Sequence, residues 1–501
     1  MSDPQKTYTH YQELTQKAAD LQYAAAVLGW DQEVYMPSKG FAYRGRQLAT
    51  LATQAHEIVT NEKYGMLLHE LSNANTLTNV QQTNVRLSLE DYEKNSKLSG
   101  EFIEALTVQT SASYNAWIQA RKENDYSIYA PQLGKMIALK REQAKLYGYN
   151  AHPYDALLDD YEKGATVAML DNVFATVREQ IPPLLQKIKN APQVSNDFFH
   201  QHYPRQQQWD FSIDVLRKMG YDLDAGRQDI SEHPFTTSFA PEDVRITTRV
   251  DEENYASMLW SSIHEGGHAL YEQGLPLAEY GMPLGAAASL SIHESQSRLW
   301  ENCVGRSYSF WQYFYPQLQQ YFPNQLQNIS AKDFYKGINK VQPSLVRTEA
   351  DELTYHFHVM IRYEIEKALI EGTLDPTDVR DAWNKGYKKY LGMVPPDDKA
   401  GVLQDVHWSH GSFGYFPTYS LGSFYAAQFF QQAVNDVPGL LADIQHGNYE
   451  NLLHWLRKHV HQYGRRFRSE ELCNKITGKG LDMSIFMHYA SSKYTEVYDL
   501  Q

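Results

Sequence analysis

Residues 261–274 read Ser261-Ser-Ile-His-Glu-Gly-Gly-His-Ala-Leu-Tyr-Glu-Gln-Gly274, and this stretch carries the strongest signal in the chain. On a helix, His264 and His268 lie one turn apart on the same face, where two imidazoles can bind one cation such as zinc. Glu265 cannot easily bind the same ion, but it can reach a water molecule bound there. That is the general-base position of a metalloprotease. The stretch therefore predicts a helix that carries a metal site.

The two glycines of this stretch support the same interpretation. Gly266 and Gly267 would each cost about 1 kcal/mol relative to alanine inside a helix. Such a cost suggests that another group needs to approach the backbone closely at this point. A metzincin would need glycine at position 271 and histidine at position 274, but the chain has Tyr271 and Gly274, which excludes that class.

A catalytic zinc site needs a third protein ligand and one open position. Glu272 is poorly placed, because it lies one further turn, about 6 Å, along the helix axis. A second amphipathic helix is expected to start near Ser289 and to return Glu294 towards the two histidines. Glu301, two turns further along, is the alternative third ligand. His293 points about 100° away from Glu294 on the same helix, so we expect it to support the site or to be structural.

Composition excludes several other classes. The 501 residues carry 46 basic and 60 acidic side chains, a formal net charge of −14, which disfavours a nucleic-acid or anionic-membrane binder. No apolar run approaches the roughly 18 residues of a membrane span, and the N-terminus lacks the apolar region of a secretory signal. Cys303 and Cys473 are the only cysteines, which fits free thiols in a reducing compartment, most simply the cytoplasm.

The rest of the chain predicts a mainly α protein with one small antiparallel sheet. Strict alternation over Val244–Val250 is typical of a strand, and His233–Phe239 can pair with it across the turn at 240–243. The even composition, with no repeat or flexible linker, predicts a single domain over residues 1–501. Helices are expected at 11–29, at 168–188 with an interruption at Pro182 and Pro183, at 354–370 and at 423–434.

Several short motifs, taken together and in order, resemble one family. They are His264-Glu-x-x-His268, His293-Glu-Ser-Gln-Ser297, His233-Pro-Phe235, Asp243-Val-Arg-Ile-Thr247, Val346-Arg-Thr-Glu-Ala-Asp351 and Gly401-Val-Leu-Gln-Asp-Val-His-Trp408, with Trp30-Asp-Gln and His152-Pro-Tyr-Asp155 as further similarities. The set is similar to the thermostable carboxypeptidase 1 family, the Taq-type H-E-x-x-H metallocarboxypeptidases, over essentially the whole chain.

The resemblance implies a fold and an activity that spacing alone does not give. The implied fold is a single large helical body with a central groove, similar to neurolysin and angiotensin-converting enzyme. The implied activity is removal of C-terminal residues from peptides with broad side-chain specificity, poor at proline. One zinc ion per chain, replaceable by cobalt, and a homodimer are implied as well. The resemblance assigns the metal to His264, His268 and Glu294, with Glu265 as the general base.

A carboxypeptidase must hold the terminal carboxylate of its substrate, which arginine does well because it can donate two parallel hydrogen bonds. Arg347 is the first candidate for this role and Arg245 is the second. Asp351 could instead pair with Arg347 one helical turn away, which would make the motif structural.

The segment from His407 to Tyr419 is rich in histidine and tyrosine, and related enzymes use such residues around the oxyanion. We expect Tyr419, and after it Tyr415, to stabilise the oxyanion. His407 and His410 are expected to contact substrate. A glycine-rich loop with packed aromatic rings is the structural alternative for this segment.

Two other functions remain open at this stage. One is a groove-type zinc oligopeptidase or endopeptidase, which would not need to bind a terminal carboxylate. The other is an all-α interaction protein whose pair of histidines is accidental.

Overall fold

The computed structural model describes residues 3–500, which form two compact units. Unit 1 comprises residues 3–96, Ser195–Ile338 and Tyr425–Leu481, and unit 2 comprises Lys97–Val194, Asn339–Phe424 and residues 482–500. Each unit is thus assembled from three separate segments of the chain. The single catalytic domain over residues 1–501 stays a prediction.

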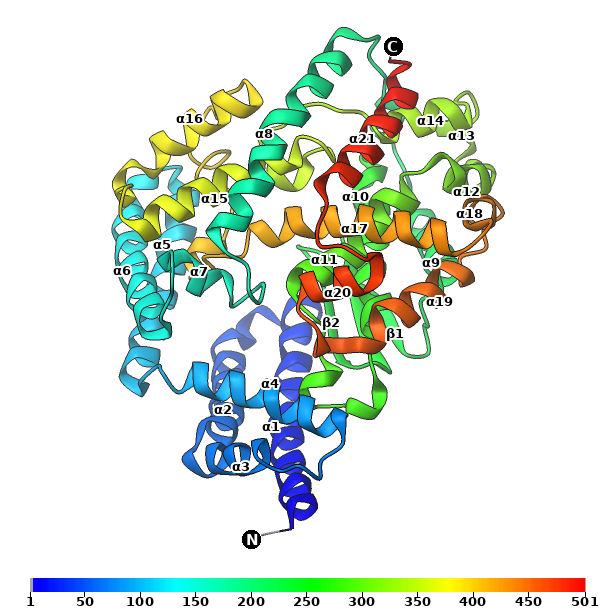
Figure 1. The fold of residues 1–501 in the computed structure, drawn as a ribbon. Helices are drawn as coiled ribbons and strands as arrows, with labels where there is room; N and C mark the ends of the chain where they lie inside the picture. Colours follow the sequence, from blue (N-terminus) through cyan, green and yellow to red (C-terminus); the bar gives the residue numbers. More distant parts are fainter. Residues whose placement is uncertain (1–2, 501) are drawn as a thin grey trace. The chain divides into compact units, whose positions relative to one another are not determined.

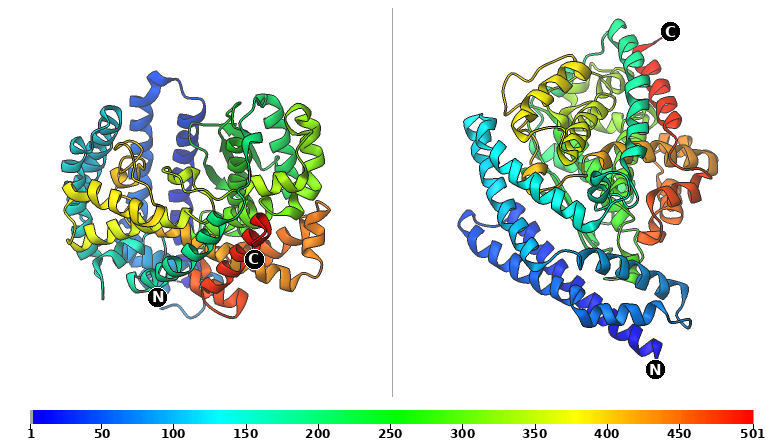
Figure 2. Two further views of the ribbon diagram at one scale, coloured as in Figure 1. Left: turned by 90° about the horizontal axis from the view of Figure 1, so that it is seen from above. Right: turned by 60° about the vertical axis from the view of Figure 1, so that its left-hand side comes forward.

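Unit 1 contains the metal motif and is mostly helical. In Figure 1 and Figure 2 the long α1 and α2 lie side by side. Its main elements are α1 (Pro4–Val34), α2 (Phe41–Thr60), α3 (Glu62–Ser72), α4 (Asn79–Asn95), α9 (Arg205–Met219), β1 (Gly226–Ile230), β2 (Thr236–Ala240), β3 (Asp243–Thr248), α10 (Tyr255–Glu272), α11 (Leu290–Arg298), the π-helix η6 (Leu299–Gly305), α12 (Tyr308–Tyr321), α13 (Pro323–Leu326), α14 (Ala331–Ile338), α18 (Leu440–Gln445), α19 (Glu450–His459) and α20 (Ser469–Thr477).

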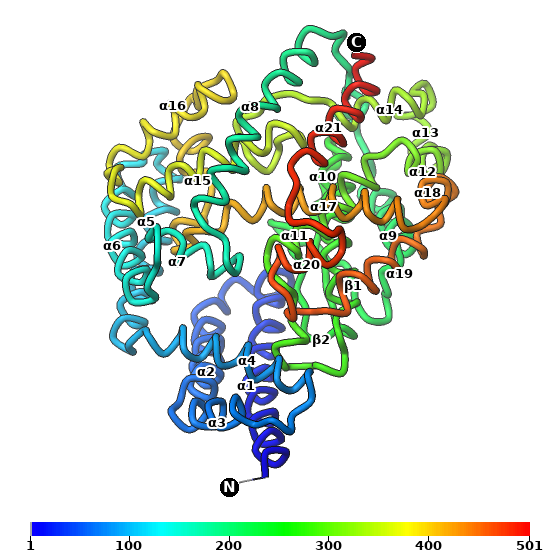
Figure 3. The backbone as a smooth tube through the Cα atoms, viewed as in Figure 1, coloured from blue at the N-terminus to red at the C-terminus, as the bar shows by residue number. Residues whose placement is uncertain are grey.

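Unit 2 is helical throughout the elements assigned to it. Figure 3 shows α8 and α21 running side by side although they are far apart in the sequence. Its main elements are α5 (Gly100–Glu123), α6 (Ala130–Tyr147), α7 (Pro153–Leu158), α8 (Val167–Asn190), α15 (Tyr355–Glu371), α16 (Val379–Leu391), the 3-10 helix η9 (His407–His410) and α21 (Met483–Tyr498); the chain passes from unit 2 to unit 1 within α17 (Pro417–Asp436).

The mainly α class is confirmed, and the four expected helices are present as α1, α8, α15 and α17. Helix α8 continues through Pro182 and Pro183, so the expected interruption there is wrong. Both prolines are exposed, while Ile181 and Leu184 beside them are buried. The ring and the missing N–H therefore lie on the solvent side, where they disturb no packing. Between residues 3 and 500, no helix is both long and apolar enough to span a bilayer.

The sheet of unit 1 has three strands in the order β1-β3-β2. The expected antiparallel pair is present, with Thr236 opposite Ile246. A third strand, β1, joins β3 in parallel, so the sheet is mixed rather than wholly antiparallel. Its sequence, Gly226-Arg-Gln-Asp-Ile230, has only one β-branched residue and no hairpin turn to β3, so the patterns typical of a strand are absent there.

Helix α10 is the centre of unit 1, because it packs against α9, α11, β2 and β3. Its mostly buried sequence fits this position, and α11 begins near Ser289 as expected, with the Ser289 side chain accepting a hydrogen bond from the Ile292 backbone N–H. The two histidines of α10 and Glu294 of α11 are thereby brought to a single helix–helix contact.

Candidate metal centre

Close packing of α10 on α11 depends on Gly267. A Cβ atom at position 267 would lie 2.7 Å from Ser297 Cα and 2.8 Å from Gln296 O, distances at which backbone would have to move. At Gly266 a Cβ atom would meet only the ends of two side chains, Leu216 at 2.6 Å and Met219 at 3.5 Å. The close approach inferred from the two glycines is therefore confirmed at Gly267, and the partner is the backbone of α11.

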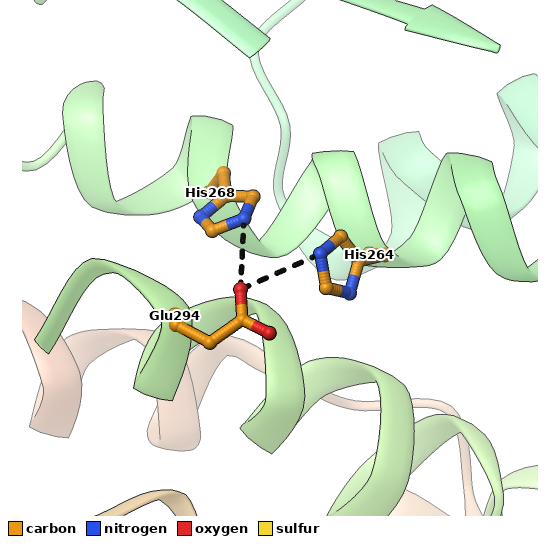
Figure 4. Close-up of side chains that lie close together, drawn as sticks. All are labelled: His264, His268 and Glu294. Atoms are coloured by element: carbon orange, nitrogen blue, oxygen red, sulfur yellow. Dashed lines mark ion pairs between the residues drawn. The ribbon is translucent and has the colours of Figure 1, made fainter. Parts of the chain in front are cut away.

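Three side chains converge where these helices meet. His264 Nε2 and His268 Nε2 lie 3.6 and 3.5 Å from Glu294 Oε2 (Figure 4). Tetrahedral zinc with bonds of about 2.0 to 2.1 Å separates its ligand atoms by roughly 3.4 Å, so this spacing fits a zinc ion. Two imidazoles and one carboxylate also leave a fourth position for water, as a catalytic site requires.

The Nδ1 atoms of His264 and His268 have different partners. His264 Nδ1 lies 2.9 Å from Glu301 Oε2. His268 Nδ1 lies 2.6 Å from His293 Nδ1, and His293 Nε2 lies 2.7 Å from Glu272 Oε1. A hydrogen bond at Nδ1 fixes the tautomer and leaves Nε2 to bind a cation. Glu301, the alternative third ligand, thus lies at the nitrogen of His264 that faces away from Glu294.

The local environment favours the cation-binding form of His268 and Glu294, and it acts differently on His264. Burial lowers the pKa of His268 to about 3, so this ring is neutral. Burial acts on His264 in the same sense, but Glu294 and Glu301 outweigh it and raise the pKa of His264. For Glu294 burial opposes ionisation, yet Arg298 and His264 hold the pKa of its carboxyl below the ordinary value. An anionic carboxylate and imidazole lone pairs are what zinc binds.

Glu265 does not join this cluster of donor atoms. Its side chain is 7% exposed, and Thr236 Oγ1 on β2 donates a hydrogen bond to Glu265 Oε2 at 2.6 Å. Burial raises the pKa of Glu265, although His264 and Thr236 act in the opposite direction. A carboxylate with a raised pKa is a stronger base, which suits proton transfer near neutral pH.

Arg347, in unit 2, is buried and ion-paired. Its Nε and Nη2 lie 3.1 and 3.0 Å from Asp405 Oδ1, and its Nη1 lies 3.1 Å from the Tyr355 hydroxyl. Asp351 instead accepts hydrogen bonds from the backbone at the start of α15, including Thr354 N–H at 3.0 Å. The alternative pairing of Asp351 with Arg347 is therefore wrong, because Asp351 serves the helix end.

Arg362 completes what we call the arginine cluster, which consists of Arg347, Arg362 and Asp405. Arg362 is fully buried in α15, and its Nε donates to Asp405 Oδ2 at 2.6 Å. Burial opposes ionisation of Asp405, but Arg362 and Arg347 hold its pKa below the ordinary value. Two guanidinium groups share one carboxylate, so the three side chains carry a net positive charge. Sequence reasoning missed Arg362, although an arginine inside a helix of apolar and aromatic residues was a usable signal.

Arg245, the second candidate for binding a carboxylate, lies on β3 in unit 1. Its Nε and Nη2 donate to the two oxygens of Asp243 at 2.8 Å each. Its guanidinium carbon lies 4.5 Å from the centre of the Trp30 ring and 5.0 Å from that of Phe239. Arg245 therefore has its own carboxylate partner and stacks on aromatic rings.

The histidine- and tyrosine-rich segment is partly ordered by aromatic packing. His407 Nε2 lies 3.1 Å from the Tyr419 hydroxyl, and burial lowers the pKa of His407 to about 3. The Tyr415 ring lies 5.2 Å from the His407 ring, whereas the exposed His410 lies 5.0 Å from the ring of Tyr114. His407, Tyr415 and Tyr419 thus form one group, and His410 stands apart from it.

Glu366 is a further buried group that sequence reasoning missed. Its two oxygens accept hydrogen bonds from Trp408 Nε1 at 2.7 Å and from the Gly414 backbone N–H at 2.8 Å. The Tyr154 hydroxyl donates to it as well. Glu366, which lies on α15, therefore holds in place the loop that carries His407.

Comparison with known proteins places the chain in a family. The family described as Carboxypeptidase Taq (M32) metallopeptidase matches residues 10–494. The chain belongs to this family. It is accordingly a metallocarboxypeptidase and a hydrolase, and the resemblance inferred from the motifs is confirmed.

Three similar proteins illustrate the extent of the match. Thermostable carboxypeptidase 1 from Thermus thermophilus is 39% identical over 508 residues, which cover 99% of both chains. The crystal structure of M32 carboxypeptidase from Deinococcus radiodurans R1 shares 38% identity and a TM-score of 0.97, covering 99% of this chain and 100% of that one. A solved structure called CHT shares 57% identity and a TM-score of 0.96, covering 98% of this chain and 99% of that one.

Proposed function

We propose that this metallocarboxypeptidase removes C-terminal residues from peptides with broad side-chain specificity, poorly at proline, and that it uses one zinc ion per chain, for which cobalt can substitute. The observation that carries the proposal is the spacing of His264 Nε2, His268 Nε2 and Glu294 Oε2, which suits a tetrahedral cation beside a buried glutamate. When bound there, zinc would supply a Lewis acid that polarises the scissile carbonyl and acidifies a water molecule.

Glu265 takes the general-base role in this proposal. It accepts the proton of the attacking water and passes it to the amine that leaves. The support is its burial, its raised pKa and its place next to the ligand His264. The contacts of His264 Nδ1 with Glu301 and of His268 Nδ1 with His293 keep both metal-binding rings oriented through the reaction.

Arg347 is proposed to bind the terminal carboxylate of the substrate. The support is electrostatic, since Asp405 is shared between Arg347 and Arg362 and leaves a net positive charge in the arginine cluster. Such a buried excess charge favours an anion beside it. Arg245, whose charge is matched by Asp243, stays the second candidate.

Tyr419 is proposed as the oxyanion donor, with Tyr415 as the alternative, and His407 and His410 as substrate contacts. The support is the group formed by His407, Tyr415 and Tyr419, in which a neutral imidazole can donate its Nε2–H to the Tyr419 hydroxyl oxygen and so leave the hydroxyl proton for the oxyanion. His410 has weaker support, because its ring contact is with Tyr114 instead.

One experiment tests the activity directly. A peptide mixture with free and amidated C-termini is incubated with the enzyme, with and without a chelator, and read by mass spectrometry. We expect stepwise loss of C-terminal residues from the free peptides, a pause at proline, little attack on amidated peptides and no cleavage with chelator. Equal cleavage of amidated peptides at internal bonds would favour an oligopeptidase or endopeptidase and overturn the proposal.

The remaining proposals concern assembly and location. We propose a homodimer that acts on peptides in the cytoplasm, without nucleic-acid or membrane partners. The net charge of −14 disfavours nucleic-acid and anionic-membrane partners, the two buried cysteines without a disulfide, Cys303 and Cys473, fit the cytoplasm, and the dimer follows from the family resemblance. Light scattering on the purified protein should give twice the chain mass of 57.7 kDa, and a value near one chain mass would contradict the dimer.

A further inference from the structure

Two of the sequence motifs have no role in metal binding. They are His233-Pro-Phe235, which comes directly before β2, and the Asp243–Thr247 motif, which lies on the neighbouring strand β3. Thr236 follows the first motif directly and is the first residue of β2. Strand β2 lies at the edge of the sheet and packs against α10, the helix that carries Glu265.

The side chain of Thr236 contacts Glu265 at two atoms. Its Oγ1 lies 2.6 Å from Glu265 Oε2 and 3.1 Å from Glu265 O. The shorter contact is a hydrogen bond from the hydroxyl to a carboxyl oxygen. Because it engages Oε2, the other oxygen, Oε1, is the one left to accept a proton from water.

Hydrogen bonds between Phe235 and Thr247, one residue from each motif, hold the backbone next to Thr236 in place. The Phe235 backbone N–H donates to Thr247 Oγ1 at 2.9 Å, and the Thr247 backbone N–H donates to Phe235 O at 2.9 Å. Thr247 is fully buried, and Ser231 Oγ lies 2.7 Å from its hydroxyl. The residue before Thr236 is therefore fixed by both its amide and its carbonyl, which leaves Thr236 little freedom to move.

We propose that Thr236 is a positioning residue for Glu265. The two motifs together hold the strand so that the Thr236 hydroxyl contacts Oε2 of the general base. The inference rests on the proposed role of Glu265. Holding one carboxylate oxygen sets the direction of the other, and a misplacement of about 1 Å in a reacting group can cost on the order of 100-fold in rate.

The test compares substitutions at Thr236 with a matched neighbour. Thr236→Val keeps the shape of the side chain and removes the hydroxyl. We expect kcat to fall by about 10- to 100-fold with KM within about twofold and the metal content unchanged. Thr236→Ser should restore most of kcat. Thr237→Val on the same strand should leave both constants unchanged, since successive strand residues point to opposite faces.

A second readout does not depend on activity. In crystals of Thr236→Val the Glu265 carboxylate should leave its single position, whereas in Thr236→Ser it should keep it. An unchanged Glu265 side chain in Thr236→Val, or an unchanged kcat, would overturn the inference. A rise in KM alone, without a fall in kcat, would do the same.

Failure of the proposed function gives a different result. If Glu265→Gln with bound metal turns over substrate at the wild-type rate, Glu265 is not the base and the positioning role falls with it. If Glu265→Gln is inactive while Thr236→Val is fully active, Glu265 remains the base and only the role of Thr236 is lost.

Discussion

The two buried clusters of charge in this chain are incomplete in opposite ways. The metal centre brings together acceptor atoms of His264, His268 and Glu294, an arrangement that a cation completes. The arginine cluster has two guanidinium groups and one carboxylate, an arrangement that suits an added anion. The chemistry of the gathered groups thus indicates the ligand class of each site: acceptor lone pairs suit a cation, and excess guanidinium charge suits an anion.

The largest expected effect is at the metal centre. Glu265→Gln removes the proton acceptor but no metal ligand, so kcat should fall by about 1,000-fold while the metal content stays near one per chain. Steady-state kinetics and metal analysis on the same sample measure both. Glu294→Gln is the control, and it should lose the metal together with the activity. Wild-type turnover by metal-loaded Glu265→Gln would contradict the assignment of Glu265 as the general base.

The next largest effect tests the arginine cluster. In Arg347→Met, Asp405 keeps Arg362 as partner but the excess positive charge is gone. The kcat/KM for peptides with a free C-terminus should fall by about 100-fold, with little change for amidated peptides. Arg245→Met is the matched control. If Arg245→Met loses the preference for free termini and Arg347→Met keeps it, the roles of the two arginines are reversed.

A smaller effect separates the two metal histidines. Glu301 contacts His264 directly, whereas Glu272 reaches His268 only through His293. Glu301→Gln should therefore weaken metal binding by about 10- to 100-fold, and Glu272→Gln should weaken it less. Competition with a chelator of known affinity measures both. Equal affinities in the two variants would show that the outer partners do not act as the contacts suggest.

The metal centre could be predicted from the sequence because its geometry is local. The spacing of His264 and His268 fixes their relation on one helix, and the cost of Gly267 signalled the close approach of α11. Glu294 was favoured over Glu301 by its distance along the chain from the loop. The hydrogen bond from Thr236 to Glu265 had no such signal, since β2 and α10 meet only in the folded sheet–helix packing.

The contacts of the arginine cluster could not be predicted from residue spacing, because its members are distant in the sequence. Asp405 lies 58 positions from Arg347, and nothing in the spacing connects them. Asp351, four residues away, was the natural partner on helical geometry, but it follows a 3-10 turn and accepts backbone hydrogen bonds from the residues just before α15 instead. The parallel strand β1 was missed for the same reason, because parallel pairing needs a crossover and leaves no turn to recognise.

The smallest effect concerns two buried histidines, one near each cluster. Burial lowers the pKa of His461, whose Nε2 lies 3.1 Å from Gln296, to about 3, and burial with Arg362 and Arg347 lowers that of His358 well below its usual value. The unfolded chain then binds more protons than the folded one below about pH 6.5, so the free energy of unfolding falls as pH falls. His461 should contribute up to about 1.4 kcal/mol per pH unit between about 6.5 and 3, and His358 should contribute in the same sense. In denaturant titrations, the stability of the wild type relative to His461→Gln or His358→Gln should therefore fall as the pH falls below about 6.5. A pH-independent difference at either position would contradict the lowered pKa of that histidine.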